Sequence, residues 1–351
     1  TGTVSDPNAV VVVTIDGNDY TATNNGDGTW TLADNAVATL AEGSYPTSVT
    51  ATDDAGNADT DTGTVVIDTT APTVAINDLT TNDTTPELTG TVSDPNAVVV
   101  VTIDGNDYTA TNNGDGTWTL ADDVVATLAE GSYTATVTAT DTDGNTGTNS
   151  GTVVIDTTAP TVAINDLTTN DTTPELTGTV NDPNAVVVVT IDGNDYTATN
   201  NGDGTWTLTD NVVATLAEGS YPTSVTATDN AGNTDTDTGT VVIDTTAPTV
   251  AINDLTTNDT TPELTGTVSD QNAVVVVTID GNDYTVTNNG DGSWTLADDV
   301  VATLAEGSYT ATVTATDADG NNGTNSGTVV IDTTAPTVAI NDLTTNDTTP
   351  E

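Results

Sequence analysis

Short segments of the chain alternate between apolar and polar residues with a period of two. Between Thr69 and Asp156, runs rich in Val and Thr are separated by clusters of Gly, Asn and Asp, and a 3.6-residue periodicity is nearly absent. This pattern predicts β-strands joined by turns. We expect seven strands, at residues 73–76, 86–92, 97–103, 107–112, 117–120, 132–141 and 150–156. Seven short strands in a segment of this length are typical of a β-sandwich, so the predicted fold class is all-β.

Several segments indicate how the sandwich is assembled. "AVVVV" at 97–101 lacks alternation, which predicts a central strand covered on both faces. "TATVTAT" at 134–140 places Ala and Val on one face and Thr on the other. The sequences D-G-N at 104–106 and N-G-D-G at 113–116 predict hairpin turns, because Gly and Asn tolerate the positive φ that tight turns require.

Two aromatic side chains are expected to pack inside this fold. Trp118 lies in a short predicted strand, and a large aromatic residue there predicts a core position. Tyr133 begins the sixth predicted strand, where immunoglobulin-like folds place a corner tyrosine that bonds back to the backbone. Both residues are therefore interpreted as structural.

The pattern returns every 88 residues through the whole chain. The phrase "IDTTAPTVAIND" begins at Ile67, Ile155, Ile243 and Ile331. A repeat of this length suits one small domain with its own core, so we expect independently folding domains cut from a longer array. The predicted domains are 69–156, 157–244 and 245–332, with 1–68 as a repeat lacking its first strand and 333–351 as the start of another.

The composition changes the picture because every charged side chain is acidic. The 351 residues include 53 Asp and Glu, no Lys, Arg or His, and no Cys, so the formal charge is -53. Nucleic acid and anionic lipid would be repelled, and we predict no nucleic-acid partner and no direct membrane insertion. Small cations that prefer oxygen ligands, above all Ca²⁺, are the expected partners. The usual catalytic bases and nucleophiles are missing, so we predict no enzyme.

The linker "DTTAP" (residues 68–72 and its later copies) determines which acidic residues meet. Antiparallel strands reverse direction, so the loops divide between two ends of each sandwich, and the lower end of one domain faces the upper end of the next. Carboxylates gathered there repel one another, and Ca²⁺ with six to eight oxygen ligands would remove that repulsion. At the junction between the second and third domains, the candidate ligands are Asp78, Asp83, Asp104, Asp107, Glu130, Asp156, Asp182 and Asp229.

Equivalent acids at the other positions complete the predicted metal ligands. They are Asp68, Asp94, Asp141, Asp166, Asp171, Asp192, Asp195, Glu218, Asp244, Asp254, Asp270, Asp280, Asp317 and Asp332. Some acids also have a simpler interpretation, since Asp104 and Asp115 belong to Asp-Gly turns and Asp83 and Asp122 can be solvated loop charges. "DTDGN" at Asp141 lacks the complete EF-hand pattern, so the hypothesis depends on the junctions and not on a motif.

Three phrases carry a resemblance to a known family. "VVIDTTAPTVAI", "TTPELTGTV" and "YTATVTATDxxGN" resemble the tandem bacterial immunoglobulin-like repeats of very large Gram-negative adhesins, including the extender regions of repeats-in-toxin adhesins. The resemblance implies a calcium-stiffened spacer, secreted by a type I system, which holds distal binding domains away from the cell surface in adhesion or biofilm formation. It also implies an extracellular, monomeric rod whose neighbouring repeats contact one another. Asp156 and Asp229 match positions that bind calcium in such repeats.

A different class of function stays open at this point. The repeats themselves would then bind a glycan, another copy, or ice through the outward threonines of "TATVTAT", although Thr is also simply a good strand residue. The first and third repeats share "YPTSVTATD" and "DTDTG", whereas the second and fourth share "YTATVTATD" and "TNSG". Because the acids of this region alternate, we expect calcium affinity to differ slightly between successive junctions.

Overall fold

The computed structural model describes residues 1–342, 344–345 and 348–349. Its residue contacts form two units, which are described separately below: Thr1–Thr158 with Asn230–Gly232, and Ala159–Asp229 with Asn233–Glu351. In the described part of the chain, no helix has the length and hydrophobicity needed to cross a membrane. The secondary structure consists of strands, as the alternating pattern predicts.

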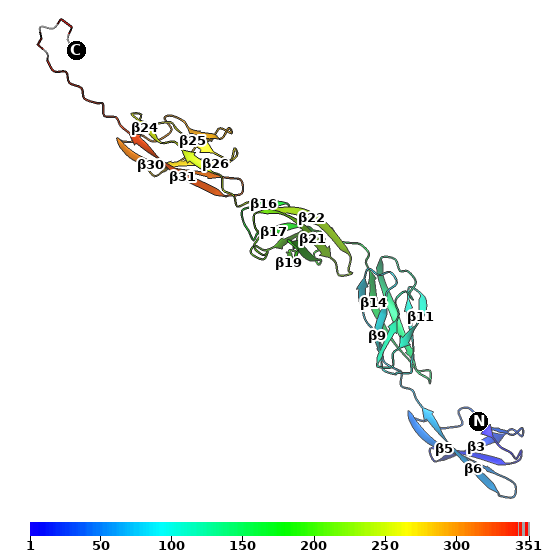
Figure 1. Cartoon of the computed structure of the whole chain (residues 1–351). Helices are drawn as coiled ribbons and strands as arrows, with labels where there is room; N and C mark the ends of the chain where they lie inside the picture. Colours follow the sequence, from blue (N-terminus) through cyan, green and yellow to red (C-terminus); the bar gives the residue numbers. More distant parts are fainter. Residues whose placement is uncertain (343, 346–347, 350–351) are drawn as a thin grey trace. The chain divides into compact units, whose positions relative to one another are not determined.

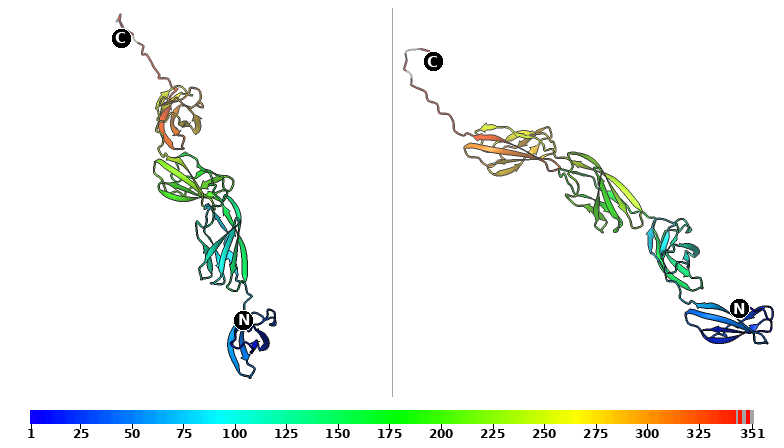
Figure 2. Two further views of the ribbon diagram at one scale, coloured as in Figure 1. Left: turned by 90° about the vertical axis from the view of Figure 1, so that its right-hand side faces the viewer. Right: turned by 60° about the horizontal axis from the view of Figure 1, so that its bottom comes forward.

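Repeat 2 (residues 69–156) contains eight strands in two layers. They are β7 (Val74–Ile76), β8 (Leu79–Thr81), β9 (Leu88–Val92), β10 (Val98–Ile103), β11 (Asn106–Asn112), β12 (Thr117–Leu120), β13 (Gly131–Thr140) and β14 (Thr146–Ile155). Strands β7, β9, β12 and β11 form one layer, and β10, β13, β14 and β8 follow in the other. The layers enclose one core (Figures 1 and 2). The predicted all-β sandwich is confirmed, with β8 as an additional strand in an expected loop.

The other repeats follow the same plan. Repeat 1 (1–68) contains β1 (Gly2–Thr3), β2 (Val10–Ile15), β3 (Asn18–Asn24), β4 (Thr29–Thr31), β5 (Gly43–Thr52) and β6 (Ala58–Ile67). Repeat 3 (157–244) contains β15 (Val162–Ile164), β16 (Leu167–Thr169), β17 (Leu176–Val180), β18 (Val186–Ile191), β19 (Asn194–Asn200), β20 (Thr205–Leu208), β21 (Gly219–Thr228) and β22 (Thr234–Ile243). Repeat 4 (245–332) contains β23 (Val250–Ile252), β24 (Leu255–Thr257), β25 (Leu264–Val268), β26 (Val274–Ile279), β27 (Asn282–Thr285), β28 (Thr287–Asn288), β29 (Ser293–Leu296), β30 (Gly307–Thr316) and β31 (Asn322–Ile331). Beyond Ile331 the described residues form no strand, and part of the predicted 333–351 repeat lies outside them.

The two aromatic residues have the predicted roles. Trp118 is 0% exposed, and its indole N–H donates a hydrogen bond of 2.9 Å to the carbonyl oxygen of Ala75 in β7. Strand β7 is thereby held to the core by the Trp118 side chain as well as by its backbone pairing with β9. The Tyr133 hydroxyl donates to the carbonyl oxygen of Ala129 at 2.9 Å, which is the corner-tyrosine bond.

The outer face of β10 differs from the prediction. Val99 and Val101 are buried, but Val98 is 58% exposed, so the valine run is not covered on both faces. The outward valines lie beside threonines, because Val98 pairs with Thr140 of β13. The run reflects the preference of β-branched residues for strands and not burial on two sides. In β13 the predicted alternation is confirmed, with Ala and Val inward.

The strand register divides the loops between two ends of each sandwich, as expected. Val98 at the start of β10 pairs with Thr140 at the end of β13, so the loops that carry Asp94 and Asp141 lie at one end. Gly131 pairs with Ile155, which places the Glu130 loop and the end of β14 at the other. The chain therefore leaves each sandwich at the end opposite to the loops that carry Asp94 and Asp141.

Candidate metal centre

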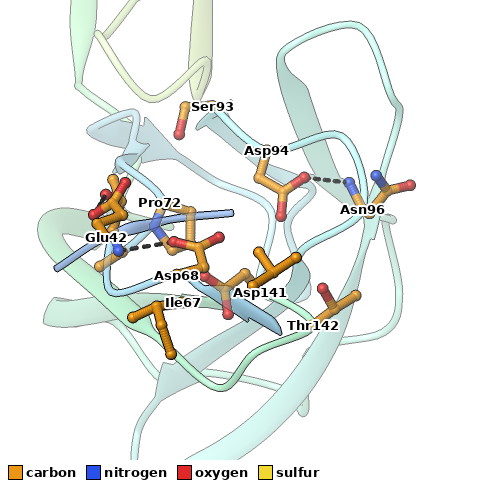
Figure 3. A pocket seen from close by; sticks show the side chains of 13 residues that line it. Glu42, Ile67, Asp68, Pro72, Ser93, Asp94, Asn96, Asp141 and Thr142 are labelled. Carbon is orange, nitrogen blue, oxygen red and sulfur yellow. Dashed lines mark hydrogen bonds between the residues drawn. The ribbon is translucent and has the colours of Figure 1, made fainter. Parts of the chain in front are cut away.

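The first unit contains a hollow of about 600 Å³ where repeat 1 ends and repeat 2 begins. Asp68 follows the last strand of repeat 1, whereas Asp94 and Asp141 come from two loops of repeat 2. Figure 3 shows these three carboxylates around the hollow, with Glu42 on the side of the linker. The remaining lining residues are Gly43, Val66, Ile67, Thr70, Ala71, Pro72, Ser93, Asn96 and Thr142. The structure therefore brings together three of the predicted ligands, and Glu42 joins them.

Backbone hydrogen bonds orient each of these carboxylates. The Thr70 N–H donates to Oδ1 of Asp68 at 2.9 Å, and the Asn96 N–H donates to Oδ1 of Asp94 at 2.9 Å. Asp141 accepts from the N–H of Asn145 at 2.8 Å and from its side-chain amide at 2.9 Å, and these bonds hold the pKa of Asp141 below its usual value. Asp68 and Asp94 keep acceptor capacity for a cation, because a carboxylate offers about four lone-pair positions.

An asparagine connects the two repeats at this hollow. The side-chain amide of Asn145 also donates to the carbonyl oxygen of Asp68 at 3.2 Å. The second unit repeats the arrangement, since Asn321 donates to the carbonyl oxygen of Asp244 at 2.9 Å and to the carboxylate of Asp317 at 3.0 Å. The Asn272 N–H orients Asp270 at 2.8 Å in the same way. The sequence analysis did not select Asn145, although its place in the recurring D-x-x-G-N turn was a visible signal.

A glutamate holds the two threonines of each linker. Oε2 of Glu130 accepts hydrogen bonds from the hydroxyls of Thr157 at 2.9 Å and Thr158 at 2.8 Å. The bond from Thr158 and then the bond from Thr157 keep the pKa of Glu130 below its usual value. Equivalent bonds and lowered pKa values occur at Glu42, Glu218 and Glu306. The linker is thus restrained by the chain itself.

This glutamate clamp predicts a pH dependence. Because the pKa of Glu130 is lower in the folded chain than in the unfolded one, the clamp stabilises the linker above about pH 4.3 and is lost as pH falls through the lower folded value. Replacing Thr157 and Thr158 with Val should raise the pKa of Glu130 toward about 4.3. Carbon-13 NMR titration of the carboxyl groups measures this shift. An unchanged Glu130 pKa in the double variant would contradict the clamp.

Several predicted ligands accept hydrogen bonds or form turns within their own repeat. Oδ1 of Asp78 accepts a hydrogen bond of 2.7 Å from the Thr152 N–H, and Asp166 and Asp254 do the same in their repeats. Asp107 accepts from the Thr102 hydroxyl at 2.6 Å, as Asp195 does from Thr190. Residues Asp104, Asp192 and Asp280 have φ values of 50°, 50° and 49°, which makes them turn residues.

The other predicted ligands also have local partners. Oδ1 of Asp83 and of Asp171 accepts the N–H two residues later at 2.9 Å, and Oδ1 of Asp332 accepts that of Thr334 at 3.1 Å. Asp156 belongs to the first unit and accepts the Thr158 N–H at 3.0 Å. Asp182 and Asp229 belong to the second unit and accept the N–H groups of Asn184 at 2.9 Å and Asn233 at 2.8 Å.

Asp83 and Asp122 form a pair of neighbouring carboxyl groups that the sequence analysis did not predict. Asp122, interpreted there as a solvated charge, forms a hydrogen bond with Asp83 that raises the pKa of Asp122. The Thr85 N–H is the main cause that lowers the pKa of Asp83. Asp298 and Asp259 repeat the pair in repeat 4. Two carboxyl groups this close together mark a place where negative charge is concentrated.

The donor set of the hollow fits a hard cation. Its polar groups are carboxylate, amide and hydroxyl oxygens, which are the ligands that Ca²⁺ prefers, and the chain has no Lys, Arg or His to neutralise them. The described residues contain no group of three or more acids already arranged to hold a metal ion. Binding would therefore require the carboxylates around the hollow to rotate toward a common point.

A family model identifies the type of domain. A family model described as "Bacterial Ig-like domain" matches residues 1–69, 73–157, 161–245 and 249–333. No curated protein sequence matches the chain. Similar solved structures include a tetra-tandem repeat in the extending region of a large adhesion protein, with 31% identity over 94% of this chain and 93% of that chain and a TM-score of 0.33. Another is a Ca²⁺-stabilised adhesin that helps an Antarctic bacterium to reach out and bind ice, with 24% identity over 94% and 92% of the chains and a TM-score of 0.34.

Proposed function

We propose that this chain, which belongs to the bacterial Ig-like domain family, is a calcium-rigidified spacer in a large adhesin on the outside of a bacterial cell. The observation that carries the proposal is that acidic residues recur at the junctions of a chain that has no basic side chain. The carboxylates of Asp68, Asp94 and Asp141 surround one hollow, and the chain contains no basic side chain. A spacer requires length, solubility and a controlled angle between its domains, and not a chemical reaction.

The junction residues would act together on the linker. Bound Ca²⁺ would neutralise the gathered carboxylates and supply a centre with flexible coordination. Asp68 would hold it from the linker, whereas Asp94 and Asp141 would hold it from the next repeat. The N–H groups of Thr70 and Asn96 each bond one oxygen of one of these carboxylates, which leaves acceptor capacity for the cation once the carboxylates have rotated. The linker and the loops of the next repeat would then move as one body.

We further propose that the chain is not an enzyme and that it is exported to the cell surface, with type I secretion as the route. Without His, Cys, Lys or Arg, only carboxyl, phenol and hydroxyl groups remain for chemistry. The acidic surface keeps such an array soluble and separated from other acidic surfaces. We expect the array to be monomeric.

Small-angle X-ray scattering tests the spacer function. The chain is measured in EDTA, in millimolar Ca²⁺ and in millimolar Mg²⁺. We expect Ca²⁺ alone to increase the radius of gyration toward that of an extended rigid particle. The increase should become smaller when Asp68, Asp141, Asp244 and Asp317 are all replaced with Asn, because these replacements remove acids from two of the junctions.

A matched control has the same change in charge away from the hollow. Asp27, Asp115, Asp203 and Asp291 accept hydrogen bonds within their own turns and do not line the hollow. Their replacement with Asn should leave the calcium response intact. If the scattering of the original chain is the same in all three buffers, the spacer would not be calcium-rigidified, and direct ligand binding by the repeats would become the better hypothesis.

A further inference from the structure

The first strand of repeat 3 has two backbone donors on its outer edge. Ala163 in the middle of β15 pairs with Thr179 of β17. The residues that flank β15 continue this ladder: the Asn181 N–H donates to the carbonyl oxygen of Thr161 at 3.1 Å, and the Asn165 N–H donates to that of Thr177 at 3.0 Å. Alternate residues of an antiparallel edge strand direct their N–H groups away from the ladder. The N–H groups of Val162 and Ile164 therefore face β22, the last strand of the same repeat.

Two carboxylates on β22 accept these donors. Oδ2 of Asp235 accepts the Val162 N–H at 2.9 Å, and Oδ2 of Asp237 accepts the Ile164 N–H at 3.0 Å. Both aspartates are partly buried and lie on the inward face of β22, where Asp235 pairs with Ala227 and Asp237 pairs with Val225. Charged acceptors make stronger hydrogen bonds than neutral ones, and a partly buried carboxylate requires such partners.

Repeats 2 and 4 attach the same strand in a different way. Gly147 and Gly323 occupy the position of Asp235, and Asn149 and Asn325 occupy that of Asp237. A Cβ atom added to Gly147 would lie 1.8 Å from the carbonyl oxygen of Pro72, and the distance is also 1.8 Å for Gly323 and Pro248. The backbone before the first strand thus rests directly on the glycine. An aspartate cannot occupy that position without moving the backbone away.

We propose that Asp235 and Asp237 form a carboxylate clip that fastens β15 to β22 and replaces the backbone docking of repeats 2 and 4. The clip joins the first and last strands of repeat 3, where tension would enter and leave the domain. It needs no cation, because the two N–H groups already satisfy one oxygen of each carboxylate. Repeat 1 has the same residue types at Asp59 and Asp61, but the strand that they would hold is not among its strands β1 to β6.

Thiol labelling tests the clip in the complete chain. The chain has no Cys, so Val162→Cys introduces a unique thiol into β15 even among nearly identical repeats. In EDTA, we expect the replacement of both Asp235 and Asp237 with Ala to increase the labelling rate of this thiol about 10- to 100-fold, because two charge-assisted hydrogen bonds are lost. Replacing Asp235 with Gly and Asp237 with Asn, the residues of repeats 2 and 4, removes the same two charges. This pair should increase the labelling rate less than about 3-fold, because the glycine permits the backbone docking of those repeats.

Two further reporters make the result specific. Val225→Cys places the thiol in β21, where the side chain is 0% exposed, and Val250→Cys places it in β23 of repeat 4. Neither should label faster when the clip is removed. Equal acceleration at positions 162 and 225 would overturn the proposal, since the aspartates would then stabilise the whole repeat. Equal effects of the Ala–Ala and Gly–Asn pairs, or no effect of either pair, would also overturn it.

Discussion

Chelation of calcium is expected to lower the midpoint of thermal unfolding by roughly 10 to 20 °C at neutral pH. A ligand that binds only the folded state stabilises it by about 2.7 kcal/mol when its concentration is 100 times its dissociation constant. A stability change of about 1 kcal/mol shifts the midpoint of a small domain by roughly 4 to 8 °C. The proposed sites connect adjacent repeats, so the gain should require an intact junction. Scanning calorimetry in EDTA and in millimolar Ca²⁺ measures the shift.

Two controls separate specific binding from the screening of charge. Concentrated NaCl in EDTA reduces the repulsion between carboxylates without occupying a site, because it shortens the screening length to about 3 Å at 1 M. Mg²⁺ supplies the same charge but requires a smaller and more regular coordination shell. A shift reproduced by either salt would assign the effect to general charge neutralisation. Replacing Asp68 and Asp141 with Asn should reduce the calcium shift, whereas replacing Asp115 should preserve it.

The sequence predicts much of the fold because the period and the turns are local signals. The run from Thr134 to Thr140 alternates as expected, and the turn at Asp104 forms where Asp-Gly requires it. Strand β8 is short and polar, so its parallel pairing with β14 has no local signature. The exposure of Val98 was also unpredictable from the valine run, since β-branched residues favour strands on either face.

The candidate site is predictable only in part, because a carboxylate's role depends on the donors around it. Asp68, Asp94 and Asp141 come from different loops and line one hollow. Asp78 is equally acidic and lies in an expected junction loop, and its Oδ1 accepts the N–H of Thr152, a residue 74 positions away, at 2.7 Å. Asp235 belongs to the shared phrase "DTDTG", which does not reveal its partner, and the structure directs its carboxylate to the backbone of β15. Val162 and Asp235 are 73 positions apart in the sequence, so no local pattern predicts that they meet.

Replacement of Trp206 with Ala is expected to lower the unfolding temperature of repeat 3 while repeats 2 and 4 keep theirs. Trp206 is 0% exposed, and its indole N–H donates to the carbonyl oxygen of Ala163 at 3.0 Å. Removal of a buried aromatic side chain costs about 3 to 5 kcal/mol, and here the Ala163 carbonyl also loses its donor. A small domain is stable by only about 5 to 15 kcal/mol, so most of the stability of one repeat would be lost.

Separate cores in the repeats determine how the variant should unfold. The buried residues form a distinct cluster in each repeat, with Trp118 and Trp294 in the clusters of repeats 2 and 4. Calorimetry of the variant should therefore contain one transition at a lower temperature and leave the others in place. Val212→Ala is the matched control, since Val212 is 48% exposed and its truncation leaves no cavity. A single shifted transition for the whole chain would contradict independent folding. An array with independent cores can lose one repeat under load while the remaining repeats stay folded.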